Sequence, residues 1–160
     1  RQRNCKAGWR SWVFRNYNVG GEYNMNNALY IDKLTYQELG SRSAKVLTQN
    51  ALGEKKIAKV LSLISQDKLN LIDAINEDEC VSMTIRIDGH KFWIGVLDSL
   101  NEVSYIYDNL SGNETYIAVG GDDYPGWAIC DDIELVKQIF MEFAYKGMRY
   151  NSVTWREDDM

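Results

Sequence analysis

Apolar residues near the end of the chain recur at the three- and four-residue spacing of an amphipathic helix, and they predict a helix from about Asp132 to Lys146. Asp131 or Asp132 can cap its first amides, and Gly147 can adopt the left-handed conformation that ends a helix. The same spacing predicts a second helix over residues 54–65. The apolar positions of the two helices are Ile57, Val60, Leu61, Ile64, Ile133, Val136, Ile139, Phe140 and Phe143.

Alternating apolar and polar residues predict strands between and after these helices. The expected ranges are 69–75, 81–87, 92–97, 103–107 and 115–119, and Val153 and Trp155 mark a short closing strand. Residues 29–31, Leu-Tyr-Ile, are predicted to form a first strand. Residues 43–48 fit a strand or a helix, because the pair Val46-Leu47 suits both.

Short connections between successive strands favour antiparallel neighbours. Asp88-Gly89 is a strong hairpin signal between two of the predicted strands. The order of elements predicts an α+β fold in which an antiparallel β-sheet packs against two main helices in a single domain. With 160 residues, of which 45% are hydrophobic, the chain is long enough to bury one core.

The first 24 residues differ from the rest, because they are basic, rich in Asn and aromatic residues, and lack a clear helical or strand period. We therefore divide the chain into a basic N-terminal arm, residues 1–24, and an α+β domain, residues 25–160. Gly21-Glu22 can be encoded by a ribosome-binding sequence a few codons before Met25. An alternative is therefore that translation starts at Met25 and that the arm is not native.

Charge separates the two parts further. Five basic residues against one acidic residue give residues 1–24 a net charge of +4, so the remaining residues must carry −9 for the chain to total −5. An acidic body repels nucleic acid and attracts basic partners. No apolar run approaches the roughly 20 residues that span a bilayer, and the N-terminus lacks the apolar core of a secretory signal. We expect a cytoplasmic protein that binds neither nucleic acid nor membranes.

Residues for most kinds of catalysis are scarce. The chain has one histidine, His90, directly after a predicted turn, and no zinc motif accompanies it. Its three cysteines are far apart, lack the close pairs of metal and redox sites, and are expected to be free thiols. Neither of the glycine patterns that bind phosphate occurs. The sequence predicts no catalytic residue, metal or cofactor. One alternative is a small enzyme that uses acids between Asp122 and Asp132 on a carbohydrate or a nucleotide.

Aromatic residues are abundant, with ten Tyr, five Trp and four Phe. Those at strand and helix positions, Trp93, Trp155, Phe140 and Phe143, are expected in the core. Aromatic residues in loops beside acids suit recognition of a basic protein, because the rings give contact area and the carboxylates pair with Lys or Arg. The predicted partner-binding residues are Tyr107, Asp108, Tyr116, Asp122, Asp123, Tyr124 and Trp127.

The last third of the chain carries a recognisable succession of residues. Tyr124-Pro125-Gly126 and Ile129 precede the helix that contains Val136, Phe140 and Phe143, and Gly147 and Val153-Thr154-Trp155 follow it. This arrangement resembles immunity protein family one of bacterial polymorphic toxin systems. That family has a hydrophobic-Pro turn, a helix that ends in Phe, a Gly, and a terminal hydrophobic-x-Trp strand.

The resemblance extends upstream, because residues 83–87, 92–97 and 104–108 look like the central hairpins of that family. It covers about residues 80–156. The chain departs from the family in having Tyr150-Asn151-Ser152 where a Pro is common after the Gly.

The resemblance implies an antitoxin. Members of the family look like proteins encoded beside contact-dependent or secreted toxins, often nucleic-acid deaminases, which they bind and block in the cytoplasm of the producing cell. The implied partner is a cognate protein toxin with a basic surface, and neither enzymatic activity nor a cofactor is implied. An adaptor or scaffold domain is the remaining alternative, and the sequence leaves the oligomeric state open.

Overall fold

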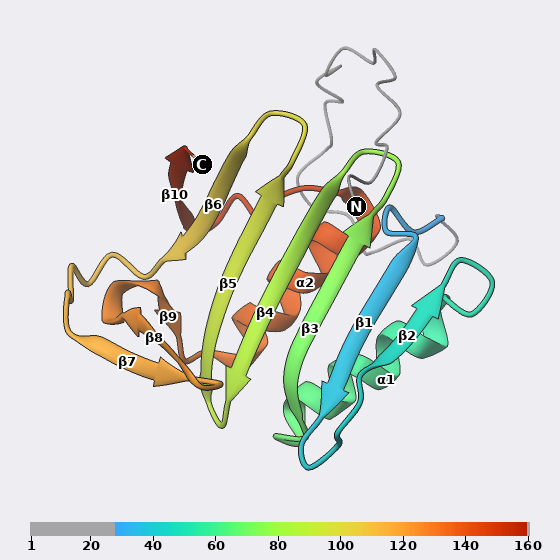
Figure 1. Ribbon diagram of the computed structural model, residues 1–160, viewed down its shortest axis with the longest axis horizontal. Coiled ribbons are helices and arrows are strands. Elements are labelled where there is room, and N and C mark those ends of the chain that lie inside the picture. Colours follow the sequence, from blue (N-terminus) through green and yellow to red (C-terminus); the bar gives the residue numbers. More distant parts are fainter. Residues whose placement is uncertain (1–27, 160) are drawn as a thin grey trace.

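The computed structural model describes residues 28–159, in which one twisted β-sheet carries two helices (Figure 1). The sheet has the strand order β10-β6-β5-β4-β3-β1-β2, and the short β9 pairs with β5. All pairs of neighbouring strands in this sheet are antiparallel. The strands are β1 Lys33–Glu38, β2 Lys45–Thr48, β3 Leu69–Asn76, β4 Val81–Asp88, β5 Lys91–Asp98, β6 Val103–Asp108, β9 Ile129–Cys130 and β10 Thr154–Asp159.

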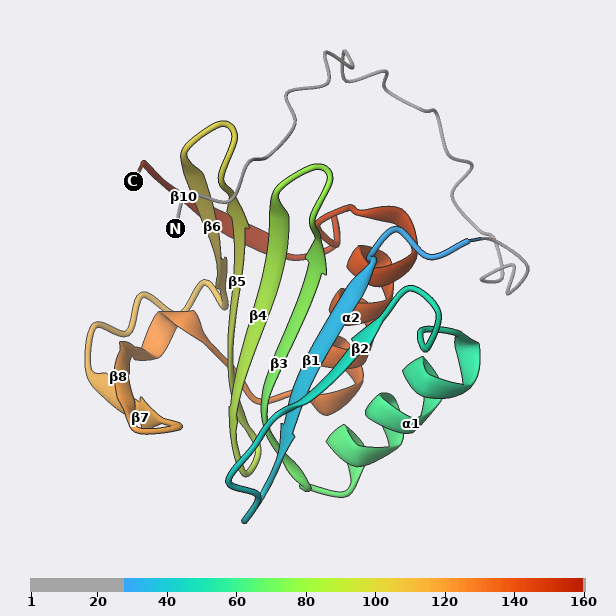
Figure 2. The ribbon, with the colours of Figure 1, turned by 45° about the vertical axis from the view of Figure 1, so that its right-hand side comes forward.

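Both predicted helices are confirmed. They are α1 Glu54–Ser65 and α2 Ile133–Lys146, and both lie on the same face of the sheet (Figure 2). The Leu135 amide donates to Asp132 Oδ1 over 3.1 Å, so Asp132 caps α2. Gly147 ends α2 with φ of 68°, a left-handed conformation that a glycine adopts without steric cost. The fold is therefore the expected α+β domain.

The core lies between the sheet and the two helices. Along β4 every second residue is buried in this layer, and β3 and β5 follow the same alternation over most of their length. The buried residues of the helices match the predicted apolar positions closely, although Leu61 and Ile133 are only partly buried and Leu63 and Ala144 join the core. Trp93 and Trp155, expected in the core, are half-buried.

The strands predicted from alternation are confirmed, and the Asp88-Gly89 signal corresponds to a tight hairpin in which Asp88 pairs with Lys91. The ambiguous residues 43–48 contain β2 and no helix. Three strands escaped prediction: β1, β9 and the strand at 122–125. The sequences KLTYQE and DDYP are mostly polar or contain Pro, and β9 has only two residues.

The expected first strand at residues 29–31 is wrong. The amides of Tyr30 and Ile31 both donate to the Ala144 carbonyl at the end of α2, over 2.9 and 3.3 Å. The Tyr30 ring meets Phe143 edge to face, with ring centroids 5.7 Å apart. This apolar run therefore packs on a helix end instead of joining the sheet. The predictions made for residues 1–24 lie outside the described residues.

Candidate protein-binding site on the β7–β8 hairpin

A separate two-stranded hairpin stands on the face of the sheet that the helices leave open (Figure 2). It consists of β7 Tyr116–Val119 and β8 Asp122–Pro125, joined by Gly120-Gly121. Cross-strand partners in an antiparallel pair share one face, and successive residues alternate between faces. One face therefore carries Ile117, Val119, Asp122 and Tyr124, and the other carries Tyr116, Ala118, Asp123 and Pro125.

The first of these faces holds the hairpin against the sheet. The Tyr124 ring stacks on Trp93 of β5, with centroids 4.9 Å apart and 21° between the planes. Asp122 lies 3.2 Å from Arg86 of β4. Burial raises the pKa of the Tyr124 hydroxyl, so the ring packs as a neutral aromatic group. An aromatic stack and an ion pair thus fix the position of the hairpin.

The Trp93 ring has room because Gly95 lies beside it on β5. A Cβ atom at Gly95 would lie 2.5 Å from Cη2 of the Trp93 ring, closer than van der Waals contact permits. The absence of a side chain at Gly95 is therefore what allows Trp93 to lie along the sheet and meet Tyr124.

The second face of the hairpin points to solvent. Tyr116 is 69% exposed, and Ala118 and Asp123 are exposed as well. Among the seven predicted partner-binding residues, Tyr116 and Asp123 are the two that the structure leaves exposed and that take no part in anchoring the hairpin. Asp122 is exposed and Tyr124 is half-buried, but both hold the hairpin to the sheet.

The remaining three predicted residues are buried, so the expectation that they present a partner-facing surface is wrong. Tyr107, Asp108 and Trp127 are 7%, 7% and 8% exposed. Tyr107 belongs to β6 and meets Trp155 edge to face, with centroids 6.5 Å apart. Trp127 lies in a short 3-10 helix, Gly126–Ala128, beneath the guanidinium of Arg156, which is 3.7 Å from the ring centroid.

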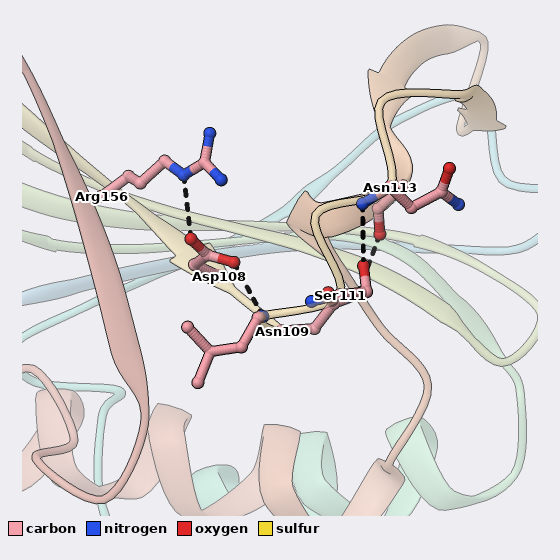
Figure 3. Close-up of polar contacts among 7 residues, drawn as sticks. Asp108, Asn109, Ser111, Asn113 and Arg156 are labelled. Atoms are coloured by element: carbon pink, nitrogen blue, oxygen red, sulfur yellow. Dashed lines mark hydrogen bonds and ion pairs between the residues drawn. The ribbon is translucent and has the colours of Figure 1, made fainter.

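Asp108 organises the segment that leads from β6 into the hairpin (Figure 3). Its Oδ2 accepts from Nε of Arg156 over 2.8 Å, and its Oδ1 accepts from the Leu110 amide over 2.8 Å. The Asn109 side chain donates to the carbonyls of Gly126 and Ile129, both at 2.8 Å. Asp108 and Asn109 therefore tie the start of this segment to β10 and to the chain that follows the hairpin.

The same kind of hydrogen bond as that between Asp108 and the Leu110 amide recurs along the following residues. Side-chain oxygens of Asn109, Ser111 and Asn113 each accept from the backbone amide two residues further on, at 2.9, 3.2 and 3.0 Å. Together with the bond from Leu110 to Asp108 they form four successive side-chain turns over residues 108–115. The segment lacks regular secondary structure, but local side-chain bonds hold four of its backbone amides (Figure 3).

Leu110 was not among the predicted binding residues, and it is unusual in two respects. It is 73% exposed, more than any other exposed large apolar residue in the described part of the chain. Its φ is +64°, a left-handed conformation that costs a branched residue roughly 1–2 kcal/mol. The sequence signal was an isolated apolar residue within the polar, glycine-containing run Asn109–Asn113.

Comparison with known proteins places this chain in a family without assigning an activity. A family model described as a family of unknown function, DUF6911, matches residues 37–150, which is most of the domain. The chain belongs to the DUF6911 family. No curated protein and no solved structure matches it. The match includes both helices, the β7–β8 hairpin and the sheet from β2 to β6, and it leaves out β10 and most of β1.

The acids and the histidine of this DUF6911 domain do not form a catalytic arrangement within residues 28–159. His90 lies at the β4–β5 turn, is largely exposed, and has Nε2 3.2 Å from Asp67. Asp122 and Asp123 lie on opposite faces of the hairpin, so their carboxylates do not converge as paired catalytic acids would. Within residues 28–159 no group of His, Cys, Asp and Glu is arranged to hold a metal ion. No helix in the same range is long and apolar enough to cross a membrane.

The expectation of free thiols holds for one of the two described cysteines and fails for the other. Cys130 is free and buried, and burial raises the pKa of its thiol, so it stays protonated and is a poor nucleophile. Cys80 is disulfide-bonded, so the expectation is wrong there. Cys5 lies outside the described residues.

One cavity of about 390 Å³ lies away from the hairpin, where residues 28–32 pass the start of α1. Asp32, Glu54 and Asp78 contribute to its lining, and Asp32 accepts from the Glu77 amide. None of the predicted partner-binding residues lines this cavity. It therefore lends no support to an enzyme built on the acids between Asp122 and Asp132.

Proposed function

We propose that this protein is an immunity protein, an antitoxin that binds a cognate bacterial toxin and neutralises it. The toxin is of the kind that acts on nucleic acid, such as a deaminase, and the antitoxin blocks its active site or substrate groove. The observation that carries the proposal is the outward face of the β7–β8 hairpin, where Tyr116 and Asp123 are exposed on a hairpin fixed by Trp93 and Arg86. The family resemblance of residues 80–156 points to the same class.

The mechanism that these residues support is steric and electrostatic. A toxin that acts on nucleic acid needs a basic groove to hold the phosphates. An acidic protein that offers an aromatic ring beside a carboxylate can enter such a groove and compete with the substrate. Because the hairpin is anchored before binding, little conformational freedom remains to be lost in the complex.

The direct test is co-expression with the product of the gene immediately upstream. We expect that product to be toxic alone, cells to survive when both are made, and the two proteins to purify together. A harmless neighbour that forms no complex would reject the antitoxin function. We also propose a cytoplasmic location. Since a disulfide such as that of Cys80 is unusual in the cytosol, fractionation beside marker proteins is the measurement that decides it.

Reversing the charge of Asp123 should slow association with the toxin several-fold at low ionic strength and have little effect at high salt. Asp123 is exposed and lies on the face of the hairpin that does not contact the sheet. It should therefore act as a charge at the rim of the interface, which affects mainly the association rate. The measurement is the association rate of Asp123→Lys at two salt concentrations.

The matched control is Asp78→Lys. Asp78 is an exposed acid in the β3–β4 turn, at the end of β4 opposite to Arg86, so the change in net charge is equal and the position differs. Equal slowing by both variants would show that overall charge, and not the hairpin, steers the partner.

A further inference from the structure

We infer that Leu110 and Tyr116 are the two apolar anchors of the toxin-binding surface, and that the segment from Asp108 to Tyr116 is built to present them. The inference rests on the proposed function, and it names the surface and the chemistry of its partner: an apolar socket bordered by Lys and Arg side chains of a basic toxin.

Exposure is the first observation. Leu110 and Tyr116 are the two most exposed large apolar side chains of the described residues, at 73% and 69%. They stand at the two ends of one seven-residue stretch that contains no other large apolar residue. A scattered exposed apolar residue is ordinary, but two such residues on one fixed segment are the pattern of interface anchors.

The backbone at Leu110 is the second observation. Of the four non-glycine residues with positive φ in the described chain, Leu110 is the one with a branched apolar side chain. Glycine would hold the same conformation without strain. The fold gains little from a leucine that is both strained and mostly in solvent, which indicates a role outside the free protein.

The support beneath the segment is the third observation. The Leu110 amide is held by Asp108, a carboxylate that is 7% exposed and is also bound by Arg156. Side-chain turns at Asn109, Ser111 and Asn113 fix the backbone in the same way as far as Thr115 (Figure 3). An irregular segment with so many internal bonds is fixed before its partner arrives, which reduces the entropy lost on binding.

Charge around the anchors indicates the partner. Two exposed carboxylates accompany Tyr116: Glu114 precedes it by two residues, and Asp123 lies on the same face of the hairpin. Residues 109–119 include no Lys or Arg. An apolar anchor with carboxylates on its border is complementary to an apolar socket with basic residues on its border.

The test uses the purified full chain and the purified toxin identified by co-expression. Leu110→Asn removes the apolar side chain and keeps a residue that tolerates positive φ, and Tyr116→Ser removes the ring. We expect each to raise the Kd by about 10- to 30-fold, with cell protection falling in parallel. Leu110→Asn should unfold at the same temperature as the wild type or higher, which a structural residue would not do.

Leu39→Asn is the matched control, because Leu39 is 57% exposed, directly follows β1, and lies toward the opposite edge of the sheet from β6. It should bind as the wild type does. Wild-type affinity in both test variants, or an equal loss in the control, would overturn this surface while the antitoxin function stands. Failure of the wild-type protein itself to bind or protect would reject the function and this surface together.

Discussion

Replacing Phe143 with alanine is expected to lower the free energy of unfolding by about 3–5 kcal/mol. Phe143 is 1% exposed, lies in the core between α2 and the sheet, and also meets the ring of Tyr30. Its loss leaves a cavity and removes the ring contact with Tyr30, one of the contacts that hold residues 29–31 on the end of α2. Since domains of this size are stable by about 5–15 kcal/mol, this loss removes a large fraction of the total free energy of unfolding.

Urea denaturation followed by circular dichroism measures this change as a lower midpoint with an unaltered slope. Phe143→Leu is the matched control, because it keeps most of the apolar volume and should cost clearly less. A loss below about 1 kcal/mol for the alanine variant would contradict the packing of α2 on the sheet.

The substitution Gly95→Val should displace the β7–β8 hairpin from the sheet. A side chain at residue 95 would occupy the space of the Trp93 ring, an overpacking that typically costs about 1–3 kcal/mol. Moving Trp93 also breaks its stack with Tyr124, which is worth about 0.5–1.5 kcal/mol. We expect reduced thermal stability, faster proteolysis at Gly120-Gly121, and weaker toxin binding, although Gly95 lies outside the proposed binding surface.

A double-mutant cycle tests whether the collision with Trp93 causes the loss of stability in Gly95→Val. If the collision with Trp93 is responsible, Gly95→Val should cost little in a Trp93→Thr background, since valine is well suited to a strand. The same cost in both backgrounds would show that Gly95 is needed for another reason.

Both effects arise where separate parts of the chain come together, and local sequence patterns carry little information about such contacts. Helices α1 and α2 were predicted almost to the residue, because the spacing of apolar residues and the caps at Asp132 and Gly147 are local signals. The central strands were predicted for the same reason. The polar strands β1 and β8 were missed, because the sequences KLTYQE and DDYP carry little of the apolar alternation that marks a strand.

The candidate site shows the same division. Aromatic residues beside acids drew attention to residues 107–127, but this pattern does not reveal which side chains reach solvent. Tyr107 and Trp127 are of residue types common in interfaces, yet both are buried. Leu110 is not flanked by aromatic residues, yet it is the most exposed large apolar residue of the described chain. Asp122 and Asp123 are adjacent and identical, yet strand alternation directs one to Arg86 and the other to solvent.

The sequence by itself determined the α+β class, both helices, the antiparallel central strands and the acidic character of the domain, because hydrophobic period, caps, turns and charge act within a few residues. Only the tertiary structure decided which face of the sheet stays open, where the β7–β8 hairpin is anchored, and that Leu110 is held strained and exposed. Those properties arise from contacts between residues far apart in the chain, such as Trp93 with Tyr124 and Asp108 with Arg156. Such pairs leave no periodic signal in the sequence.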